Sequence, residues 1–586
     1  MKKTTLMAVA LMTTATVHAD EGMWTLYDLP GAVFEQMKTE GFAMPYASIY
    51  EDKDAIKNAV VNFGGYCSGV VVSADGLLFT NHHCGFEAIR SHSTVEHDYM
   101  LNGFYAKDYK DELPNKNLFV SFMVEQKDIT SLLDSLGIYN MMPSEQDRFL
   151  DSLENVMSKE VSATDSTLRL EIKPFYEGNK YFATTYRDFR DVRLVFTVPK
   201  SMGKYGGETD NWMWPRQTCD FSVFRIYADP VTNGPADYNE KNVPYHPQSW
   251  AKVSMDGYKE GDFAMTIGYP GSTSRYLSSY GIRERRDAQN EPTYKVRGIK
   301  QDVMIKHMRA DEAVRIKYDS KYARSSNYWK NSIGMNKCID STQLIAHKTD
   351  FETRIKAYQD STGYLKGKLD FDLMRRLYDK RLDIARAMTY FYETFYGTCE
   401  LADRARRVHN GMTVEGPENK AKKQYVTFKD NSDSWDEALD KEVFVSLLQY
   451  YRKNVDKKYL PQFYHIIDTK FNGNYEAYVN HVWSKSMLMK TGKKLYINKK
   501  AFKRDLGVQM GLDILDIKAA LLTPLGAIDD SIQLQERYLC DAKIRMEMDM
   551  PHYSDANFTM RLSYGQVGGF MLGGKQSGYY TAAPSI

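Results

Sequence analysis

The segment from Cys67 to Cys84 constrains the fold of this chain more than any other, because it combines two cysteines, a turn signal and a histidine. It reads CSGVVVSADGLLFTNHHC. Two apolar runs flank Asp75-Gly76, a dipeptide that favours the tight turn of a β-hairpin. His83 directly precedes the second cysteine. We therefore predict a β-hairpin whose second strand ends in a histidine.

Length and composition are typical of a soluble protein with several domains. The chain has 586 residues, of which 43% are hydrophobic and 26% are charged. A chain of this length usually divides into more than one folded unit. The formal net charge of +1 gives no support for a nucleic-acid partner. We also predict no cofactor.

The N-terminus is typical of a secretory signal peptide. Lys2 and Lys3 form a basic start, and a short apolar core follows at residues 6–12. Val17–Ala19 offers a cleavage site of small residues. A membrane anchor would need about 20 apolar residues, and no later segment qualifies. We therefore predict that residues 1–19 are removed, that the chain has no membrane span, and that it works in the periplasm, with the cell surface and secretion as alternatives.

The six cysteines can form disulfides in such a compartment. No CxxC spacing is present, and connectivity cannot be deduced from sequence alone. We predict a Cys67–Cys84 disulfide and leave four cysteines unassigned, namely Cys219, Cys338, Cys399 and Cys540.

Hydrophobic periodicity divides the chain into a β-rich part and a helical part. Alternating apolar residues, as at 192–198, indicate half-buried strands before about residue 280. After about residue 283, apolar residues recur on one helical face, as they do at Ile299, Val303, Ala310 and Val314. From about residue 556 the sequence becomes β-like and rich in glycine. We predict a multidomain α+β protein.

His83 is the candidate general base. A histidine that activates a serine presents one ring nitrogen to the nucleophile and the other to a carboxylate, so it must be held rigidly. A strand end beside a disulfide supplies that rigidity, and chymotrypsin-type peptidases present their catalytic histidine in a similar way. His82 is the less favoured candidate, with packing or a local hydrogen bond as its alternative role.

The same segment allows a second interpretation, a zinc site. Histidines, a cysteine and acidic residues lie close together between residues 82 and 97, and zinc binds such ligands. However, HxxxH and HExxH spacings are absent, and Cys84 is better used in a disulfide. We therefore predict no metal site. A scatter of surface histidines is the remaining alternative for this segment.

Asp220 is the candidate carboxylate that orients the histidine. It precedes the apolar run FSVFRIY. An Asp so placed can hold the tautomer of the base and stabilise the imidazolium. Asp210 is the competitor, but it precedes a Trp-rich turn rather than a strand. The alternative role of Asp220 is a strand-end cap.

Asn211 and Trp212 stand close to this carboxylate, in the segment NWMWP. An amide oxygen can accept a hydrogen bond from an ammonium group, and the face of a tryptophan attracts one. The pair therefore predicts a site for the free N-terminus of a peptide. The alternative is a buried aromatic cluster.

The sequence lacks a recognisable nucleophile. A serine peptidase of this type uses a glycine-rich loop such as GNSGS or GDSGG, which exposes the serine and directs backbone N–H groups at the oxyanion. Neither loop occurs. Ser272 lacks the following glycine, and Ser577 stands in GKQSGYY, where two tyrosines would crowd an oxyanion hole. We reject both serines.

Together these residues resemble the dipeptidyl peptidase 7/11 family, the bacterial serine exopeptidases of the S46 class. The matching text includes DEGMW, LLFTNHHCGFEAIRSHSTVEHDYM, GGETDNWMWPRQTCDFSVFRIYAD, IGYPGSTSRY, KYARSSNYWKNSIGMNK and FTMRLSYGQV. These blocks occur in order and span nearly all 586 residues. The resemblance implies release of dipeptides from the free N-terminus of oligopeptides. It implies His83 and Asp220 as base and orienting acid, and Asn211 and Trp212 as the clamp on the α-amino group.

The resemblance also implies an architecture. Residues 20–282 would form the first barrel and the start of the second barrel of a chymotrypsin-like double β-barrel. A large α-helical cap, residues 283–545, would be inserted into the second barrel. Residues 546–586 would return into the second barrel. A homodimer is one assembly that the family forms.

The chain departs from the family at its C-terminal end. Family members continue for roughly a hundred further residues, enough to complete a barrel-sized unit. The nucleophilic serine, its oxyanion hole and the side-chain pocket would lie there. We therefore expect a C-terminally truncated sequence, with the serine beyond residue 586 and this chain inactive by itself. A natural pseudo-peptidase that keeps its peptide-binding cleft is the alternative.

Overall fold

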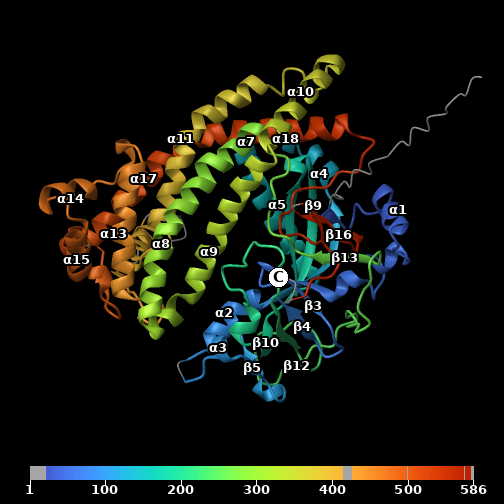
Figure 1. Cartoon of the computed structure of the whole chain (residues 1–586), viewed down its shortest axis with the longest axis horizontal. Helices are drawn as coiled ribbons and strands as arrows, with labels where there is room; N and C mark the ends of the chain where they lie inside the picture. The colour runs from blue at the N-terminus through green and yellow to red at the C-terminus, as the bar shows by residue number, and fades with distance from the viewer. Residues whose placement is uncertain (1–21, 95, 413–424, 498, 573, 583–586) are drawn as a thin grey trace, which may run out of the picture.

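The computed structural model describes residues 22–94, 96–412, 425–497, 499–572 and 574–582. The predicted signal peptide, residues 1–19, lies outside these ranges. The described chain is a mixed α/β protein in which a β-rich body and a helical body lie side by side (Figure 1). Within these ranges, no helix is both long enough and apolar enough to cross a membrane.

One large antiparallel sheet dominates the β-rich body. Among the described residues its main path runs β5-β10-β11-β4-β3-β2-β7-β9-β8, and β12 and β6 pair with β11 and β10. The strands are β2 (Val60–Phe63), β3 (Cys67–Val71), β4 (Leu77–Thr80), β5 (Phe104–Tyr105), β6 (Leu113–Pro114), β7 (Val120–Asp128), β8 (Leu168–Phe175), β9 (Lys180–Phe189), β10 (Asp191–Thr197), β11 (Ser222–Ala228) and β12 (Val243–Pro244). Apolar side chains from several of these strands, such as Phe63, Leu78, Leu194 and Phe224, are fully buried in one core cluster.

The predicted hairpin is confirmed as β3 and β4. Val70 pairs with Phe79, and Val71 pairs with Leu78. Gly76 in the turn has φ +65°, and a Cβ at this position would lie 2.8 Å from the carbonyl oxygen of Tyr245. Only glycine combines that backbone conformation with such a close approach. The turn therefore packs tightly against the backbone at Tyr245.

A second, three-stranded sheet joins distant parts of the chain. Its order is β1 (Trp24–Thr25), β16 (Arg561–Gln566) and β13 (Phe263–Gly268). In β16, Leu562 pairs with Trp24 on one side and with Ile267 on the other. The start, middle and end of the described sequence therefore meet in one sheet.

The helical body follows β13 in sequence. Its helices are α7 (Ser279–Glu284), α8 (Glu291–Ala310), α9 (Glu312–Ser341), α10 (Leu344–Thr362), α11 (Phe371–Phe395), α12 (Glu400–Met412), α13 (Glu437–Asn454), α14 (Phe463–Lys470), α15 (Tyr475–Lys485), α16 (Lys500–Lys503), α17 (Leu506–Leu522) and α18 (Gly526–Met546). A π-helix, η6 (Arg285–Asn290), connects α7 to α8. Apolar residues of α8, α11, α13 and α17 share one buried cluster.

The helical face expected to include both Val303 and Val314 is broken between α8 and α9. Asp311 has extended backbone angles, and its side chain accepts hydrogen bonds from the N–H groups of Ala313 and Val314. Such an N-cap starts a new helix rather than continuing the old one. The expectation of one face across this point was therefore wrong, although Val303 and Val314 are both buried.

Helix α9 also links the helical body to the β-rich body. Arg315 Nη2 lies 3.5 Å from Asp98 Oδ2, and Lys200 pairs with Asp319. Lys200 opens the short helix α6 (Lys200–Gly203), which precedes the loop that carries Asn211 and Trp212. These contacts place α9 beside that loop.

Candidate active site

The structure brings His83 and Asp220 into direct contact. Strand β11 pairs with β4 so that Ser222 lies opposite Thr80. Asp220 shortly precedes Ser222 in the sequence, and His83 shortly follows Thr80. His83 Nδ1 lies 2.7 Å from Asp220 Oδ2. The backbone N–H of His83 donates to Asp220 Oδ1 at 3.0 Å. The carboxylate of Asp220 therefore fixes both the ring and the backbone of His83. In the described part of the chain, Asp210 forms no hydrogen bond or ion pair with His83.

The local structure around His83 differs from the predicted strand end. Strand β4 stops at Thr80, and His82 and His83 form the first turn of helix α2 (His82–His92). The side chain of Asn81, the N-cap residue, donates to the backbone oxygen of Asp220 at 3.1 Å. Asn81 and His83, two residues apart, thus both hydrogen-bond to Asp220, which explains how the first turn of a helix can hold a histidine firmly.

The carboxyl group of Asp220 is ionised in this arrangement. Burial alone would raise its pKa, but the hydrogen bonds and charge of His83 outweigh burial and lower the pKa below its usual value. The Asp220 side chain is 19% exposed, whereas that of His83 is 68% exposed. An oriented histidine therefore faces open space while its partner carboxylate is shielded.

His82 is a packing residue, as its alternative role described. It is only 1% exposed, and its buried Nε2 has no hydrogen-bond partner among the residues that the structure describes. A Cβ on Gly203 would lie 2.6 Å from the imidazole ring, so glycine is required for this contact. Burial lowers the pKa of His82 from 6.5 to about 4, and the ring is neutral near pH 7.

A disulfide joins Cys67 to Cys84, which are 17 residues apart, and so ties β3 to α2 beside His83. The four unassigned cysteines are free; Cys219 and Cys338 are exposed, and Cys399 and Cys540 are buried. The ligand atoms of Cys67, His83 and Cys84 lie within 4.8 Å of one another. Zinc, however, binds cysteine as a thiolate, and both sulfur atoms are already joined, so this donor set does not fit a metal in the disulfide form.

Asn211 and Trp212 lie opposite helix α9. Trp212 Nε1 donates to Asn327 Oδ1 at 3.0 Å, and Asn211 Nδ2 donates to the same oxygen at 3.2 Å. Trp212 is 58% exposed. A buried aromatic cluster, the alternative for this segment, is therefore wrong, and the indole is available to a ligand.

Sequence reasoning missed the two residues of α9 that hold this loop. Besides Asn327, Lys330 donates through Nζ to the carbonyl oxygens of Thr209 at 2.6 Å and Asn211 at 3.1 Å. Asn327 and Lys330 are three residues apart and share one helical face. That spacing marks a polar helix face, but nothing in it points to a loop more than a hundred residues earlier.

Small-molecule sites usually have volumes of about 300–1,000 Å³, and the cavity over His83 has a volume of ≈ 840 Å³. Both bodies of the protein line it, with His83, Asp220, Asn211 and Trp212 from the β-rich body and Arg324 and Asn327 from α9. All four predicted catalytic and substrate-binding residues therefore meet in one space.

Among the described residues, no hydroxyl group is hydrogen-bonded to His83 Nε2. Ser272 forms a bridge with Asn557 and lines a different cavity. The hydroxyl of Ser577 accepts from the backbone N–H of Phe570 at 2.9 Å, beside the small hairpin of β17 (Met571–Leu572) and β18 (Lys575–Gln576). Neither serine lines the cavity over His83.

Comparison with known proteins places this geometry in context. The family model Peptidase S46 matches residues 19–584. Dipeptidyl-peptidase 7 of Porphyromonas endodontalis is 38% identical over 100% of this chain and 72% of its own length. Dipeptidyl-peptidase 7 of Porphyromonas gingivalis is 39% identical, over 97% of this chain and 81% of its own length. The Asp/Glu-specific dipeptidyl-peptidase of Porphyromonas gingivalis is 34% identical, over 97% of this chain and 82% of its length.

Solved structures give the same result. The crystal structure of Porphyromonas endodontalis DPP11 in complex with the dipeptide Arg-Glu has a TM-score of 0.84 and 30% sequence identity. The match covers 95% of this chain and 82% of that chain. The same protein in an alternate conformation has a TM-score of 0.72. The fold described above is therefore that of a solved dipeptide-bound structure.

Proposed function

Because this chain belongs to the peptidase S46 family, we propose that it is a serine dipeptidyl aminopeptidase that acts on oligopeptides with a free N-terminus. One observation carries the proposal. The His83–Asp220 pair and the Asn211-Trp212 loop line the same cavity. A catalytic base and an amine-binding group in one space are what an aminopeptidase requires.

In the proposed mechanism His83 acts as general base and then as general acid. Asp220 accepts from Nδ1–H, so Nε2 is left as the nitrogen that takes the proton from a serine hydroxyl. The serine then attacks the scissile carbonyl carbon, and His83 returns the proton to the leaving amine. Deacylation by water repeats the two proton transfers and releases the dipeptide.

We propose that the serine comes from outside the described residues. The 586-residue sequence contains no glycine-rich serine loop, and in the described ranges no hydroxyl bonds to His83 Nε2. The relatives named above extend beyond the matched region, since the match covers 72–82% of their length. These 586 residues are then expected to bind a peptide amine without hydrolysing the peptide.

The clamp accounts for the length of the product. Trp212 offers an exposed indole face to an ammonium group, and Asn211 offers an amide oxygen. A substrate whose amine is fixed at one point presents only one peptide bond to the catalytic centre. With room for two residues between the clamp and the serine, the product is a dipeptide.

The proposal extends to architecture and setting. We assign residues 20–282 to the first β-barrel and the start of the second, 283–545 to a helical cap and 546–586 to the return into the second barrel, which is incomplete in this sequence. The large sheet, the three-stranded sheet and the helical body support this division. We further propose a periplasmic location and a homodimer. The basic and apolar N-terminal sequence and the Cys67–Cys84 disulfide support an oxidising compartment.

The test uses the protein with the sequence that we expect beyond residue 586, called the full-length protein below. Its substrates are a pair of peptides that differ only in N-acetylation. Mass spectrometry of the products should detect dipeptides from the free peptide and none from the acetylated one. His83→Ala should abolish release, whereas His97→Ala, an exposed histidine outside the cavity, should retain it. If the full-length protein binds the free peptide but releases no dipeptide, the proposed peptidase activity is refuted and an inactive peptide receptor is supported. Release that depends on stoichiometric zinc would point to a metallopeptidase instead.

A further inference from the structure

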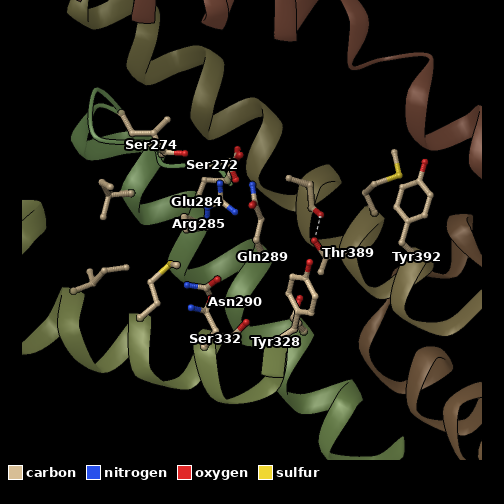
Figure 2. Close-up of a pocket in the computed structure, with 18 of the residues that line it drawn as sticks. Ser272, Ser274, Glu284, Arg285, Gln289, Asn290, Tyr328, Ser332, Thr389 and Tyr392 are labelled. Carbon is tan, nitrogen blue, oxygen red and sulfur yellow. Dashed lines mark hydrogen bonds between the residues drawn. The ribbon is translucent and has the colours of Figure 1, made fainter. Parts of the chain in front are cut away.

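A second cavity, with a volume of ≈ 820 Å³, lies inside the helical body. Helices α7, α9 and α11 and the π-helix η6 contribute side chains to it, and Figure 2 shows the polar ones converging on its interior. It shares no lining residue with the cavity over His83. A volume of this size is in the range of small-molecule sites, which is about 300–1,000 Å³.

Most of the charged groups in this cavity are already paired. Arg381 donates to both carboxylate oxygens of Glu284, each at 2.8 Å, and to Asp529 at 2.9 Å. Arg297 donates to both oxygens of Glu393, at 2.9 and 2.8 Å. These bidentate pairs fix the walls of the cavity and leave their charges compensated.

Arg285 is different. It lines the cavity and is half-buried, yet among the described residues its guanidinium group has no hydrogen bond, ion pair or aromatic contact. Burial lowers the pKa of Arg285, and the nearby charge of Glu284 opposes that effect only in part. Both oxygens of Glu284 are taken by Arg381. One fork of donors therefore faces the cavity without an acceptor.

The backbone explains why Arg285 and its neighbours point the same way. In η6 the N–H of Glu291 donates to the carbonyl oxygen of Arg286, five residues earlier. Pro292 follows and has no N–H to give. The carbonyl oxygen of Asp287 is instead satisfied by Arg386 Nε at 3.3 Å. π-Helical segments are rare in proteins, and those that occur often lie at functional sites.

Three residues of the π-helix η6, Arg285, Gln289 and Asn290, line the cavity (Figure 2). A wider turn of five residues brings positions four and five apart onto the same side. The turn therefore presents one guanidinium and two amide groups together. Ser332 and Tyr328, from α9, add hydroxyl groups on the facing wall.

Apolar side chains line another part of the cavity. Leu277, Ile339, Leu344, Met335 and Met388 contribute side chains to the same cavity. A ligand that satisfies both regions needs an acidic group at one end and an apolar body. A planar carboxylate matches the guanidinium fork with two parallel hydrogen bonds. A doubly charged phosphate is disfavoured, because three carboxylates also line the space, those of Glu284, Glu393 and Asp529.

We propose that this cavity is a second binding site, which takes a small organic carboxylate with an apolar body and holds the carboxylate on Arg285. The site is independent of the proposed peptidase chemistry. Two kinds of molecule share the required chemistry, namely an apolar amino-acid derivative or short peptide, and a medium-chain fatty acid. N-acetyl-leucine and octanoate represent them as probes. Neither carries a free amine, so neither meets the requirement of the Asn211-Trp212 loop.

Isothermal titration calorimetry of the 586-residue chain with N-acetyl-leucine and with its uncharged analogue N-acetyl-leucinamide tests the proposal. The carboxylate should bind at least about tenfold more tightly than the amide, because a hydrogen-bonded charge is lost. Arg285→Gln should weaken binding of the carboxylate by about the same factor. Arg283→Gln, in the preceding helix, is the matched control, because Arg283 pairs with Asp379 and does not line the cavity. Trp212→Ala should leave binding unchanged.

Octanoate in the same titrations identifies the source of the ligand, because the tighter of the two carboxylates reveals which apolar body the cavity prefers. If neither carboxylate binds at about 10 mM, or if the acid and amide bind equally, the proposal is wrong. Loss of binding in the Trp212→Ala variant would also refute it, because the probe would then occupy the cavity over His83. Should Arg285→Gln fail to fold, the comparison of acid and amide on the unaltered chain still decides.

Discussion

The buried imidazole of His82 should make the stability of this protein depend on pH in a way that a single substitution removes. Burial lowers the pKa of His82 from 6.5 to about 4 in the folded state. Between those values the unfolded chain binds a proton that the folded chain does not. The neutral ring therefore stabilises the fold above pH 6.5, and this contribution is lost as the pH falls towards 4.

The expected size follows from the shift. A shift of one pKa unit corresponds to about 1.4 kcal/mol, so the full effect is about 3 kcal/mol. At pH 5 about 2 kcal/mol of this is already lost relative to pH 7. Buried acids act in the opposite direction, because burial raises the pKa of Glu177 to about 7 and that of Asp440 to about 7. Their effect must be separated from that of His82.

His82→Phe makes that separation. Phenylalanine keeps an aromatic ring against Phe86, whose ring centroid lies 5.9 Å from that of His82, and it removes an Nε2 that has no partner. Urea denaturation of both proteins at pH 7 and pH 5 gives the free energy of unfolding. The unaltered protein should lose about 2 kcal/mol more than the variant between these pH values. Equal losses in the two proteins would refute the reasoning, because the acids are present in both.

Three further changes have expected outcomes. Gly203→Ala should cost about 1–3 kcal/mol of stability, since its Cβ would lie 2.6 Å from the His82 ring, whereas Gly334→Ala in α9, with no atom within 4 Å, should gain up to about 1 kcal/mol in the same denaturation assay. Asp220→Asn should reduce kcat of the full-length protein about 10⁴-fold without unfolding it, because the tautomer of His83 is no longer fixed; a loss below tenfold would argue against a triad. Lys330→Met should raise KM for free-amine peptides about tenfold, because three hydrogen bonds from the charged Lys330 to backbone oxygens of the loop are lost, and an unchanged KM would mean that the loop holds its shape alone.

Local signals in the sequence were sufficient for the hairpin and for the contact between His83 and Asp220. Asp75-Gly76 specifies its turn through backbone geometry that few other residues adopt, and the structure has that turn. Asp220 was preferred over Asp210 because it precedes a strand, and that strand places it against His83. In both cases the deciding interaction lies within an element or between paired strands.

Contacts between distant segments could not be derived in this way. Asn327 meets Trp212 across 115 residues of sequence, and no periodicity encodes which loop a polar helix face will contact. The start of α2 at His82 was missed for a related reason, because Asn81 stands at the N-cap position without a side-chain capping hydrogen bond, and its side chain donates to Asp220 instead. The sequence of residues 80–83 is compatible with the end of a strand and with the start of a helix, and tertiary contacts decide between the two.

The unpaired Arg285 was also beyond reach of the sequence. Arginines are frequent in the helical body, and an arginine without a partner looks like any other until its neighbours are placed. Glu284 stands next to it in the chain, but the fold gives that carboxylate to Arg381. Competition among charges for partners is a property of the packed structure.

The most direct test of the proposed function is covalent capture of the nucleophile by a dipeptidyl phosphonate ester with a free amine. The reagent bonds to a serine only when a base activates that serine, and only when the amine clamp positions the phosphorus. Mass spectrometry of the full-length protein should find one labelled serine, and labelling should be lost with His83→Ala and with the N-acetylated reagent. Labelling that persists with the acetylated reagent would contradict the clamp, and an absence of labelling with active protein would contradict the Ser-His-Asp mechanism.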